Sequence, residues 1–456
     1  MRLVQMKGCN MRRFISGALA AALMITMLAG CTGSESSVGE SSQSESAGTT
    51  AENVENTPAE GTGSWATNPV KVTAEGDVDM ETALSYQTDI EALVAALNAK
   101  TVDPSKPVSE NSSDFAMETF NYLYEGYGKR IISAQQQMGN QTYEDLVYYD
   151  STGDLPAMKG FDFIFSTGKN PDNYMIDEAI EWHKTSGGLV TFTWHWNVPR
   201  DIDNLDKGIA FYQKEILNWS PLNAVTPGTK EYEQIIHDID YIAIQLQRME
   251  KEGMTILFRP LHEASGSWFW WGVQDKQYVL DEIFQKLWYI IFDRIENYHK
   301  LTNIIWVWNG QSKYCQVSPN SYDIAGVDYY ANSEDHSACE QKYSQLKGLN
   351  QGSEKMLALS ECGYIPDPQA CKDADSMWLY YMIWNGDFVY ETYGEGGGIK
   401  VSLDGTPSPN PERMTKEMLQ EYFANEYFVS WSDLPTKGDT PTAIKTWEYF
   451  RIKPTE

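Results

Sequence analysis

Positively charged residues are scarce in this chain. Its 456 residues include 35 lysines and arginines against 64 aspartates and glutamates, which gives a formal net charge of −29. Proteins that bind nucleic acid carry clustered lysine and arginine, so this composition argues against a nucleic-acid partner. A polyanionic substrate is disfavoured for the same reason, whereas a neutral polymer such as a hemicellulose is not.

Motifs for nucleotides, nucleophilic serines and metals are missing as well. No GxGxxG follows the first predicted strand and no P-loop occurs, which argues against nucleotide binding. No GxSxG occurs, so Ser360 lacks the nucleophile elbow of many serine hydrolases. The six histidines and six cysteines show no compact zinc-ligand spacing, and no loop has the EF-hand pattern. The sequence therefore predicts neither a cofactor nor a metal.

Long hydrophobic runs are also absent. Phe14–Met27 is a mostly apolar stretch after Arg12 and Arg13, and it is too short to predict a membrane-spanning helix. A positive region before a short apolar run is typical of an export signal. The next residues, LAGC at Leu28–Cys31, resemble the bacterial lipoprotein box, which implies a lipid on Cys31. An ordinary cleaved signal peptide is the alternative.

Composition divides the chain into three regions. Residues 1–31 are the expected lipoprotein signal peptide with its lipidation cysteine. Residues 32–70 are rich in Ser, Gly, Thr, Ala and Glu, and Thr32–Pro69 has no Lys, Arg or His. Such a segment cannot bury enough apolar surface to fold, so we expect a disordered linker. Residues 71–456 are expected to form one catalytic domain, held at a bacterial cell surface or found outside the cell.

The remaining cysteines leave their pairing open. Cys315, Cys339, Cys362 and Cys371 lie in the expected domain. Four cysteines allow three full pairings, and the sequence does not choose among them. Free buried thiols are equally consistent with the sequence.

Short β-rich runs alternate with helical patterns from about Asn121 onward. The helical patterns include Glu231–Gly253 and Lys276–Lys300, and Asp89–Lys100 predicts a shorter amphipathic helix. The β-rich runs are nearly continuous in apolar residues, as parallel strands buried on both faces are. Eight strand–helix repeats predict an α/β fold of the (β/α)8 TIM-barrel type rather than an open doubly wound sheet. The eight predicted strands are Arg130–Gln135, Phe161–Ser166, Leu189–Trp196, Met254–Pro260, Asn303–Asn309, Asp323–Tyr330, Met356–Glu361 and Leu379–Asn385.

Polar residues gather at the ends of these strands. The active site of a (β/α)8 barrel lies at the carboxyl ends of its strands. Charged residues at such positions are costly to bury unless they are paired, so their convergence on one face predicts a catalytic site. In strand order they are His195 and Trp196, then Arg259, His262 and Glu263, then Trp308 and Asn309, then Asp328 and Tyr330, then Glu361, and finally Trp384.

Glu263 and Glu361 are the candidate catalytic pair. Their strands, the fourth and the seventh, lie across the barrel mouth, so the carboxyl groups can face each other over one sugar. Glycoside hydrolysis needs one protonated carboxylic acid and one ionised carboxylate. A separation of roughly 5–5.5 Å gives retention, whereas roughly 6.5–9.5 Å admits a water and gives inversion. The alternative is that each glutamate only ends a strand by pairing with a nearby arginine.

Aromatic residues are abundant, with 15 tryptophans and 27 tyrosines. Trp268, Trp270 and Trp271 closely follow the strand 4 glutamate, and flat apolar rings of this kind stack on sugar faces. His195 and His262 are expected either to hold a sugar hydroxyl or to orient a carboxylate. A zinc site built from these histidines and a glutamate is a further alternative, although the ligand spacing is not compact.

The strand 4 segment resembles a known family. RPLHEASGSWFWWG, Arg259–Gly272, closely resembles the acid/base motif of glycoside hydrolase family 26, the β-mannanase family in a large clan of retaining (β/α)8 hydrolases. In the wider clan an asparagine usually precedes the acid/base residue, whereas here His262 does, as in family 26. Similar segments follow the family order at Gly187–Pro199, Gly326–Tyr330, Ala358–Pro366 and Ile383–Phe388, and the whole resemblance covers roughly Phe120–Phe388.

The resemblance implies a role for each matching residue. Glu263 would be the acid/base and Glu361 the nucleophile, with net retention through a covalent glycosyl-enzyme. Tyr330 would hydrogen-bond the nucleophile, and Trp384 would floor the sugar site. The complete set of expected substrate-binding residues is His195, His262, Trp268, Tyr330, Trp384, Arg259 and Trp271.

The activity implied by the resemblance is that of an endo-β-1,4-mannanase. We expect a monomer that cleaves mannan, glucomannan or galactomannan without a cofactor and contacts a membrane only through its lipid. The same fold and mechanism acting on mixed-linkage β-glucan or β-1,3-xylan is a second hypothesis. A surface glycan-binding lipoprotein without catalysis is a third, and the presence of both glutamates argues against it. Residues 200–229, 313–321 and 390–411 are expected to be rim loops that set chain-length preference.

Overall fold

The computed structural model describes residues 72–73, 76–137, 143–168, 171–272, 279–350, 352–394, 398–403 and 405–450. The chain divides into two units, one of which comprises residues 66–391 and 399–456. Of the other unit, residues 1–65 and 392–398, only 392–394 and 398 are described. The predicted signal peptide, Cys31 and linker lie outside the described residues. Within the described ranges, no helix is long and apolar enough to cross a membrane.

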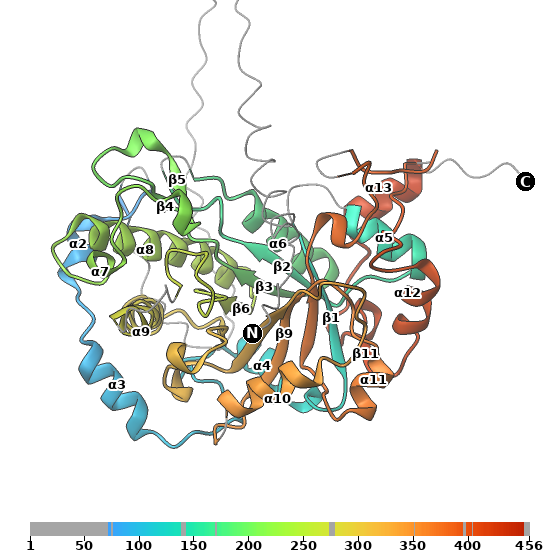
Figure 1. Cartoon of the computed structure of the whole chain (residues 1–456), viewed down its shortest axis with the longest axis horizontal. Helices are drawn as coiled ribbons and strands as arrows, with labels where there is room; N and C mark the ends of the chain where they lie inside the picture. Colours follow the sequence, from blue (N-terminus) through green and yellow to red (C-terminus); the bar gives the residue numbers. More distant parts are fainter. Residues whose placement is uncertain are drawn as a thin grey trace, which may run out of the picture. The chain divides into compact units, whose positions relative to one another are not determined.

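Eight parallel strands form a closed barrel with helices around it (Figure 1). Pairing of the first barrel strand with both the second and the last closes the sheet. The predicted (β/α)8 barrel is confirmed. Its strands, in barrel order, are β1 (Ile131–Gln136), β2 (Met158–Asp162), β3 (Leu189–Thr193), β6 (Ile256–Arg259), β7 (Ile304–Trp308), β8 (Ile324–Tyr329), β9 (Met356–Cys362) and β10 (Tyr380–Ile383).

Helices alternate with these strands, except between β7 and β8. That connection contains only the 3₁₀ turns η4 (Lys313–Cys315) and η5 (Pro319–Ser321). The other connections contain α5 (Tyr143–Thr152), α6 (Tyr174–Ser186), α7 (Pro221–Ala224), α8 (Lys230–Lys251), α9 (Val279–Asp293), the π-helical turn η3 (Arg294–Tyr298), α10 (Glu340–Leu349) and α11 (Pro368–Asp373). After β10 come η6 (Gly386–Phe388), α12 (Lys416–Phe423), β11 (Phe428–Val429), η7 (Trp431–Asp433) and α13 (Thr442–Phe450).

The helix α8 shows why the predicted helical patterns fold as they do. Thr229 caps it, because the Thr229 hydroxyl accepts the backbone N–H of Tyr232 at 3.2 Å. Acidic residues in the first turn and basic residues in the last turn match the helix dipole. Its buried stripe, spaced by three and four residues, is Ile235, Ile239, Ile242, Leu246 and Met249. The predicted helices at Glu231–Gly253 and Asp89–Lys100 thus correspond to α8 and α3 (Ile90–Ala99), and the described part of Lys276–Lys300 to α9 and η3.

The helix α4 (Asp114–Gly126) crosses the amino-terminal end of the barrel. At its start, the backbone N–H of Ser113 donates to the carbonyl of Thr302, just before β7. Thr119 donates to the hydroxyl of Thr255, just before β6. Its buried residues Phe120 and Leu123 cover the core from below. The site must therefore open at the other end of the barrel, where the strands finish.

Two strands end earlier than the sequence pattern predicts. The prediction Phe161–Ser166 is wrong at both ends, because β2 begins at Met158 and stops at Asp162, and Leu189–Trp196 is wrong at its carboxyl end, because β3 stops at Thr193. One oxygen of Asp162 accepts the backbone N–H of Ile164 at 2.9 Å, which turns the chain out of β2. The same oxygen accepts the backbone N–H of His195 at 2.9 Å and so removes it from the strand ladder. A single buried carboxylate thus ends both strands.

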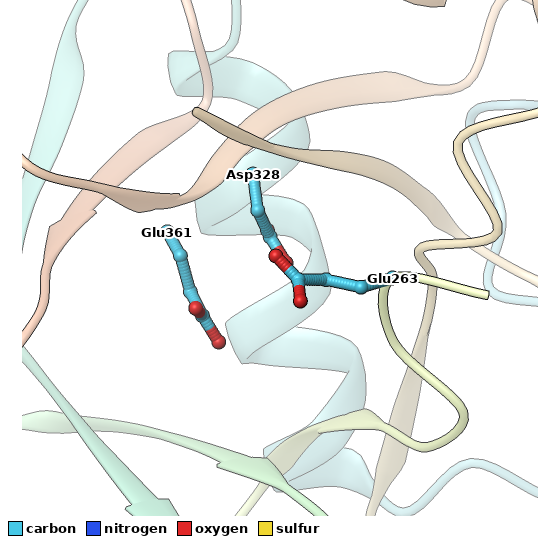
Figure 2. A group of neighbouring side chains, drawn as sticks. All are labelled: Glu263, Asp328 and Glu361. Carbon is cyan, nitrogen blue, oxygen red and sulfur yellow. The ribbon is translucent and has the colours of Figure 1, made fainter. Parts of the chain in front are cut away.

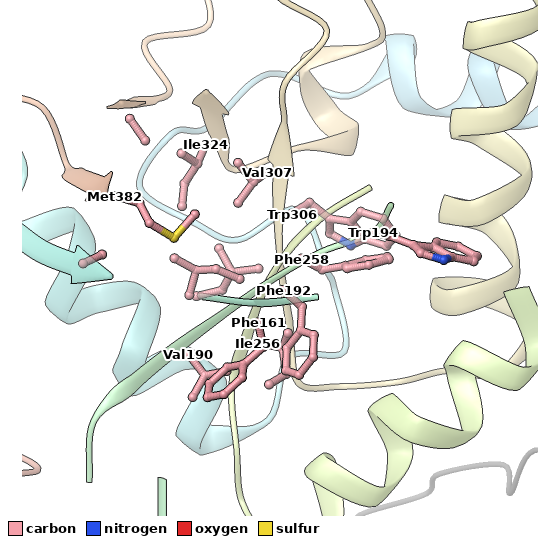
Figure 3. Close-up of a cluster of buried hydrophobic side chains, with 14 of the residues drawn as sticks. Phe161, Val190, Phe192, Trp194, Ile256, Phe258, Trp306, Val307, Ile324 and Met382 are labelled. Atoms are coloured by element: carbon pink, nitrogen blue, oxygen red, sulfur yellow. The ribbon is translucent and has the colours of Figure 1, made fainter. Parts of the chain in front are cut away.

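The barrel core is formed by apolar side chains from most of its strands (Figure 3). Full burial of one side chain of this size contributes roughly 1.5–3 kcal/mol to folding, so this cluster outweighs any single polar contact at the site. The residues labelled in the close-up are Phe161, Val190, Phe192, Trp194, Ile256, Phe258, Trp306, Val307, Ile324 and Met382.

The cysteines Cys315, Cys339, Cys362 and Cys371 are buried as thiols and not joined in disulfides. Burial raises the pKa of the Cys362 thiol well above its ordinary value. The structure therefore favours the buried-thiol interpretation over the three pairings.

A buried ion cluster ties the amino-terminal helix α2 (Met80–Ser85) to α8 and η3. The Arg294 guanidinium donates to both oxygens of Asp240 at 2.6 Å. It also donates to the carbonyl oxygens of Ala83 at 3.2 Å and Tyr86 at 3.3 Å. His299 Nε2 lies 2.8 Å from Asp240 Oδ1. Because the three ionisable groups are buried, each depends on its partners for compensation.

Replacing Arg294 by alanine is expected to lower the free energy of unfolding by about 3–5 kcal/mol, because the buried Asp240 would lose its guanidinium counter-charge and keep only His299 as a partner. Thermal unfolding followed by circular dichroism measures the loss. The matched control is Arg248→Ala, since Arg248 pairs with Asp177 at 2.6 Å on the surface and should cost about 1 kcal/mol or less. Equal losses in the two variants would contradict the role given to the buried cluster.

Candidate active site

The segment that leaves β6 holds Glu263 in a strained backbone conformation. Leu261 and Glu263 both have positive φ, at 55° and 52°. Residues other than glycine in this region cost about 1–3 kcal/mol each and persist only where the surroundings hold them. The backbone N–H of Glu263 donates to Asn309 Oδ1 at 3.1 Å, and Leu261 is fully buried. The fold therefore fixes Glu263 at the expense of local backbone stability.

A β-bulge in β9 directs Glu361 toward the same place. Val327 of β8 pairs with Leu359 and Asp328 pairs with Glu361, so Ser360 is an extra residue in β9. Bulges of this kind redirect side chains, and they are frequent beside active sites. The register shift is the structural reason why Glu361 faces the barrel mouth at the end of an otherwise apolar strand.

Two donors hold the carboxylate of Glu361. Arg259 Nη2 donates to Glu361 Oε1 at 2.5 Å, and the Tyr330 hydroxyl donates to Glu361 Oε2 at 2.6 Å. Burial and the charge of Glu361 raise the pKa of Tyr330 well above its ordinary value, so this hydroxyl stays a donor. Glu361 is thus oriented as a carboxylate with both oxygens fixed.

Asp328 completes the support beneath Glu361. Arg259 Nη1 donates to Asp328 Oδ2 at 3.1 Å, and Asn309 Nδ2 and the Ser360 hydroxyl each donate to Oδ1 at 2.7 Å. Burial, together with the charge of Glu361, raises the pKa of Asp328 to about 6 despite the opposing charge of Arg259. The sequence placed Asp328 at a strand end but gave it no role, because its partners come from other strands.

The three carboxyl groups of Glu263, Asp328 and Glu361 converge (Figure 2). One oxygen from each lies within 4.8 Å of the others. This is close to the roughly 5–5.5 Å expected of a retaining pair and well below the 6.5–9.5 Å of an inverting pair. Such a group could also hold a cation, but Arg259 already pairs with Asp328 and Glu361. The arrangement therefore fits carboxylate chemistry on a sugar better than metal binding.

Glu263 differs electrostatically from Glu361. Its side chain is half-buried, and Trp268 Nε1 donates to Glu263 Oε2 at 2.8 Å. Burial and the charges of Asp328 and Glu361 raise the pKa of Glu263 well above its ordinary value. Glu263 therefore keeps its proton at pH values where an exposed glutamate has lost it. A neutral acid beside an oriented carboxylate is the combination that acid-assisted glycoside cleavage requires.

Comparison with known proteins decides the family. The family model for Glycosyl hydrolase family 26 matches residues 108–398. This chain belongs to glycosyl hydrolase family 26. The resemblance carried by the strand 4 segment is thereby confirmed.

Several mannanases are similar to this family 26 chain. Mannan endo-1,4-beta-mannosidase B of Piromyces sp is 36% identical over 347 residues, covering 73% of this chain and 53% of that protein. The mannan endo-1,4-beta-mannosidase of Thermothelomyces thermophilus is 30% identical, covering 63% and 61%. The chain thus spans between half and two thirds of the length of these relatives. A solved ruminal GH26 endo-beta-1,4-mannanase matches with a TM-score of 0.63 and 26% identity, covering 77% of this chain and 72% of that one.

His195 and His262 lie side by side in the family 26 site. Their Nε2 atoms are 3.3 Å apart. Burial, with His195 and the charged Arg259 as neighbours, lowers the pKa of His262 well below its ordinary value, so His262 is neutral. Among the described residues, the close group of potential metal ligands comprises the three carboxylates and neither histidine. The zinc alternative therefore has no support in the structure.

The aromatic residues of the site differ in how far they are exposed. Trp268 is 46% exposed and Trp384 is half-buried, so both can meet a ligand. Trp271 is only 2% exposed, and its indole N–H donates to the carbonyl of His262 at 2.9 Å. Arg259 is fully buried beneath Glu361. Trp271 and Arg259 thus support the site from below in this structure, and their contact with substrate stays a prediction.

One wall of the site comes from the insertion after β3, which was expected to be a rim loop. It contains β4 (Val198–Pro199), η1 (Leu205–Lys207), β5 (Ile209–Ala210) and η2 (Gln213–Glu215). Tyr212 forms a bridge to Phe269, and their rings stack with centroids 5.7 Å apart. Burial and the charge of Glu263 raise the pKa of Tyr212. Sequence analysis missed Tyr212, because nothing in a loop pattern tells which side chain folds back onto the site.

Proposed function

We propose that this family 26 protein is a retaining endo-β-1,4-mannanase acting on mannan, glucomannan or galactomannan. The observation that carries the proposal is the placement of Glu263 and Glu361 with oxygens within 4.8 Å, one held as an acid and the other as an anion. The printed names of the relatives support mannan as the substrate class. The spacing supports retention over inversion.

The proposed mechanism assigns one task to each carboxyl group. Glu263 donates its proton to the glycosidic oxygen while Glu361 attacks the anomeric carbon, which forms a covalent glycosyl-enzyme. Glu263, now ionised, then takes a proton from the water that releases the sugar. Tyr330 and Arg259 hold the two Glu361 oxygens at 2.6 and 2.5 Å and so keep one lone pair aimed at the sugar.

The same proposal includes the place of action. The LAGC box and the charged linker support a bacterial cell-surface lipoprotein anchored through Cys31, with the barrel acting as a monomer outside the cell. Mass spectrometry of the membrane fraction would detect a lipid on Cys31, and ultracentrifugation of the signal-free protein would report its oligomeric state.

The test of the substrate class is a panel of polysaccharides. The signal-free protein is incubated with glucomannan, galactomannan, barley β-glucan and β-1,3-xylan, and the products are resolved by chromatography. We expect mannose-containing oligosaccharides of several lengths from the two mannans alone. Products from β-glucan or xylan alone would keep the mechanism and replace the substrate. Binding without products would favour the glycan-binding hypothesis.

A further inference from the structure

Asp162, the last residue of β2, hydrogen-bonds the side chain of His195 from behind. Asp162 is 1% exposed, and its Oδ2 lies 2.5 Å from His195 Nδ1. Its Oδ1 accepts the backbone N–H groups of His195 and Ile164, both at 2.9 Å. A carboxylate can only accept hydrogen bonds, and its Oδ2 has the His195 ring as its partner. The Nδ1 atom of His195 must therefore carry a hydrogen and donate it to Asp162.

This assignment fixes the hydrogen between the two histidines. With its hydrogen on Nδ1, a neutral His195 presents a lone pair at Nε2. That lone pair faces His262 Nε2 at 3.3 Å, and two facing lone pairs would repel. Because His262 is neutral, it satisfies the contact by carrying its single hydrogen on Nε2. His262 is then the donor and His195 the acceptor.

Thr193, the last residue of β3, completes the chain. Its hydroxyl lies 3.1 Å from His262 Nδ1 and 3.4 Å from the carbonyl of Arg259. With the hydrogen of His262 on Nε2, its Nδ1 can only accept, so Thr193 donates to it over the shorter distance. The hydrogen bonds therefore run in one direction from Thr193 through His262 and His195 to Asp162. With an ionised Asp162, donation from His195 to His262 would require a second proton on His195.

We infer that Asp162 is a positioning residue that fixes the tautomer of His195 and, through it, that of His262. The hydrogen bond between the rings then uses the single hydrogen on His262 Nε2 and the single lone pair on His195 Nε2, so the two rings hold each other in place. His195 is the more exposed ring, and it lies 5.9 Å from the Trp384 ring. The expected effect on mannan cleavage rests on the proposed function, whereas the tautomers do not.

The tautomers can be measured on the intact protein without any substrate. Long-range ¹H–¹⁵N correlation spectra of ¹⁵N-histidine-labelled protein distinguish an Nδ1–H from an Nε2–H ring. Signals are assigned from their loss in His195→Gln and His262→Gln. At neutral pH we expect His195 as the Nδ1–H form and His262 as the Nε2–H form. An imidazolium or an Nε2–H form at His195 would overturn the inference.

The variant Asp162→Asn tests the positioning role. The amide oxygen must stay with the two backbone N–H donors, so the amide NH₂ faces His195 Nδ1 and should drive the hydrogen to Nε2. We expect that change of tautomer together with a loss of at least about tenfold in kcat/KM on mannan. Unchanged tautomer and unchanged kcat/KM would refute the role. The tautomers are measured without substrate, so this test can refute the role of Asp162 whether or not the protein cleaves mannan.

Asp238→Asn is the matched control. Asp238 is equally buried and accepts the indole N–H of Trp196, the neighbour of His195, at 2.8 Å. The variant Asp238→Asn should leave the His195 signals unchanged. If it changes the His195 tautomer as much as Asp162→Asn does, the effect of Asp162 is not specific to its hydrogen bond with His195. If Asp162→Asn does not fold, Thr193→Val replaces it. That variant removes only the terminal donor and should shift the His262 Nδ1 signal while His195 keeps its Nδ1–H form.

Discussion

Glu361→Ala is expected to lower kcat on soluble mannan by about four orders of magnitude or more while binding of mannan oligosaccharides stays nearly unchanged. The variant has no atom to form the covalent intermediate, but the surfaces that hold the sugar remain. Folding should survive, because Arg259 keeps Asp328 as its counter-charge at 3.1 Å. Initial rates and calorimetric binding measure the two quantities. Glu340→Ala, at an exposed position on α10, is the control and should be fully active.

An added small anion separates loss of the nucleophile from misfolding. In Glu361→Ala, azide can occupy the space left by the carboxylate and attack the anomeric carbon of an activated aryl mannoside. The product should be the α-mannosyl azide, with inverted configuration, because attack comes from the nucleophile's side. Turnover comparable to wild type without added anion would remove Glu361 from the nucleophile's role.

Glu263→Ala is expected to lower kcat/KM on mannan by about 10²–10⁴-fold, the usual worth of a general acid. The loss should nearly vanish in the first step for an aryl mannoside with a strongly acidic leaving group, because that group departs without protonation. The control is the comparison of Glu263→Ala on mannan with the same variant on the activated aryl mannoside. A similar loss on both would show that Glu263 acts by something other than proton donation.

The pH profile supplies a second readout for the same residue. The proposed mechanism uses the acid form of Glu263. We therefore expect kcat/KM to be high below the raised pKa of Glu263 and to fall as the pH rises through that pKa. In Glu263→Ala, measured on the activated substrate, this alkaline limb should disappear. An alkaline limb that persists unchanged would belong to another group.

The placement of helices and strands could be predicted from sequence because it depends on local periodicity. Apolar runs such as the one that forms β7 are buried on both faces whatever their neighbours, and α8 has its cap, its dipole pattern and its stripe within one segment. The largest errors at strand ends fall at Asp162, whose tertiary hydrogen bonds end β2 and β3 before their β-forming residues run out. No local pattern records that contact.

The residues of the site also differ in how far the sequence predicts them. Its exposed or reactive members, Glu263, Glu361, Trp268 and the two histidines, stand out in sequence because polar and aromatic residues at the ends of apolar strands are unusual. The roles of their partners could not be predicted. Asp328 stands out at a strand end, but its partners come from other strands, and Tyr212 lies in a loop without a periodic pattern.

The sequence by itself determined the barrel class, the order of its strands and the identity of the two glutamates, because these follow from periodicity and residue type within short segments. Tertiary structure alone decided the distance within 4.8 Å between their oxygens, the burial that raises the pKa of Glu263, and the depth at which the supporting residues lie. Those properties depend on burial and on charges brought together from different strands. Closure of the barrel sets them, and no single segment contains that information.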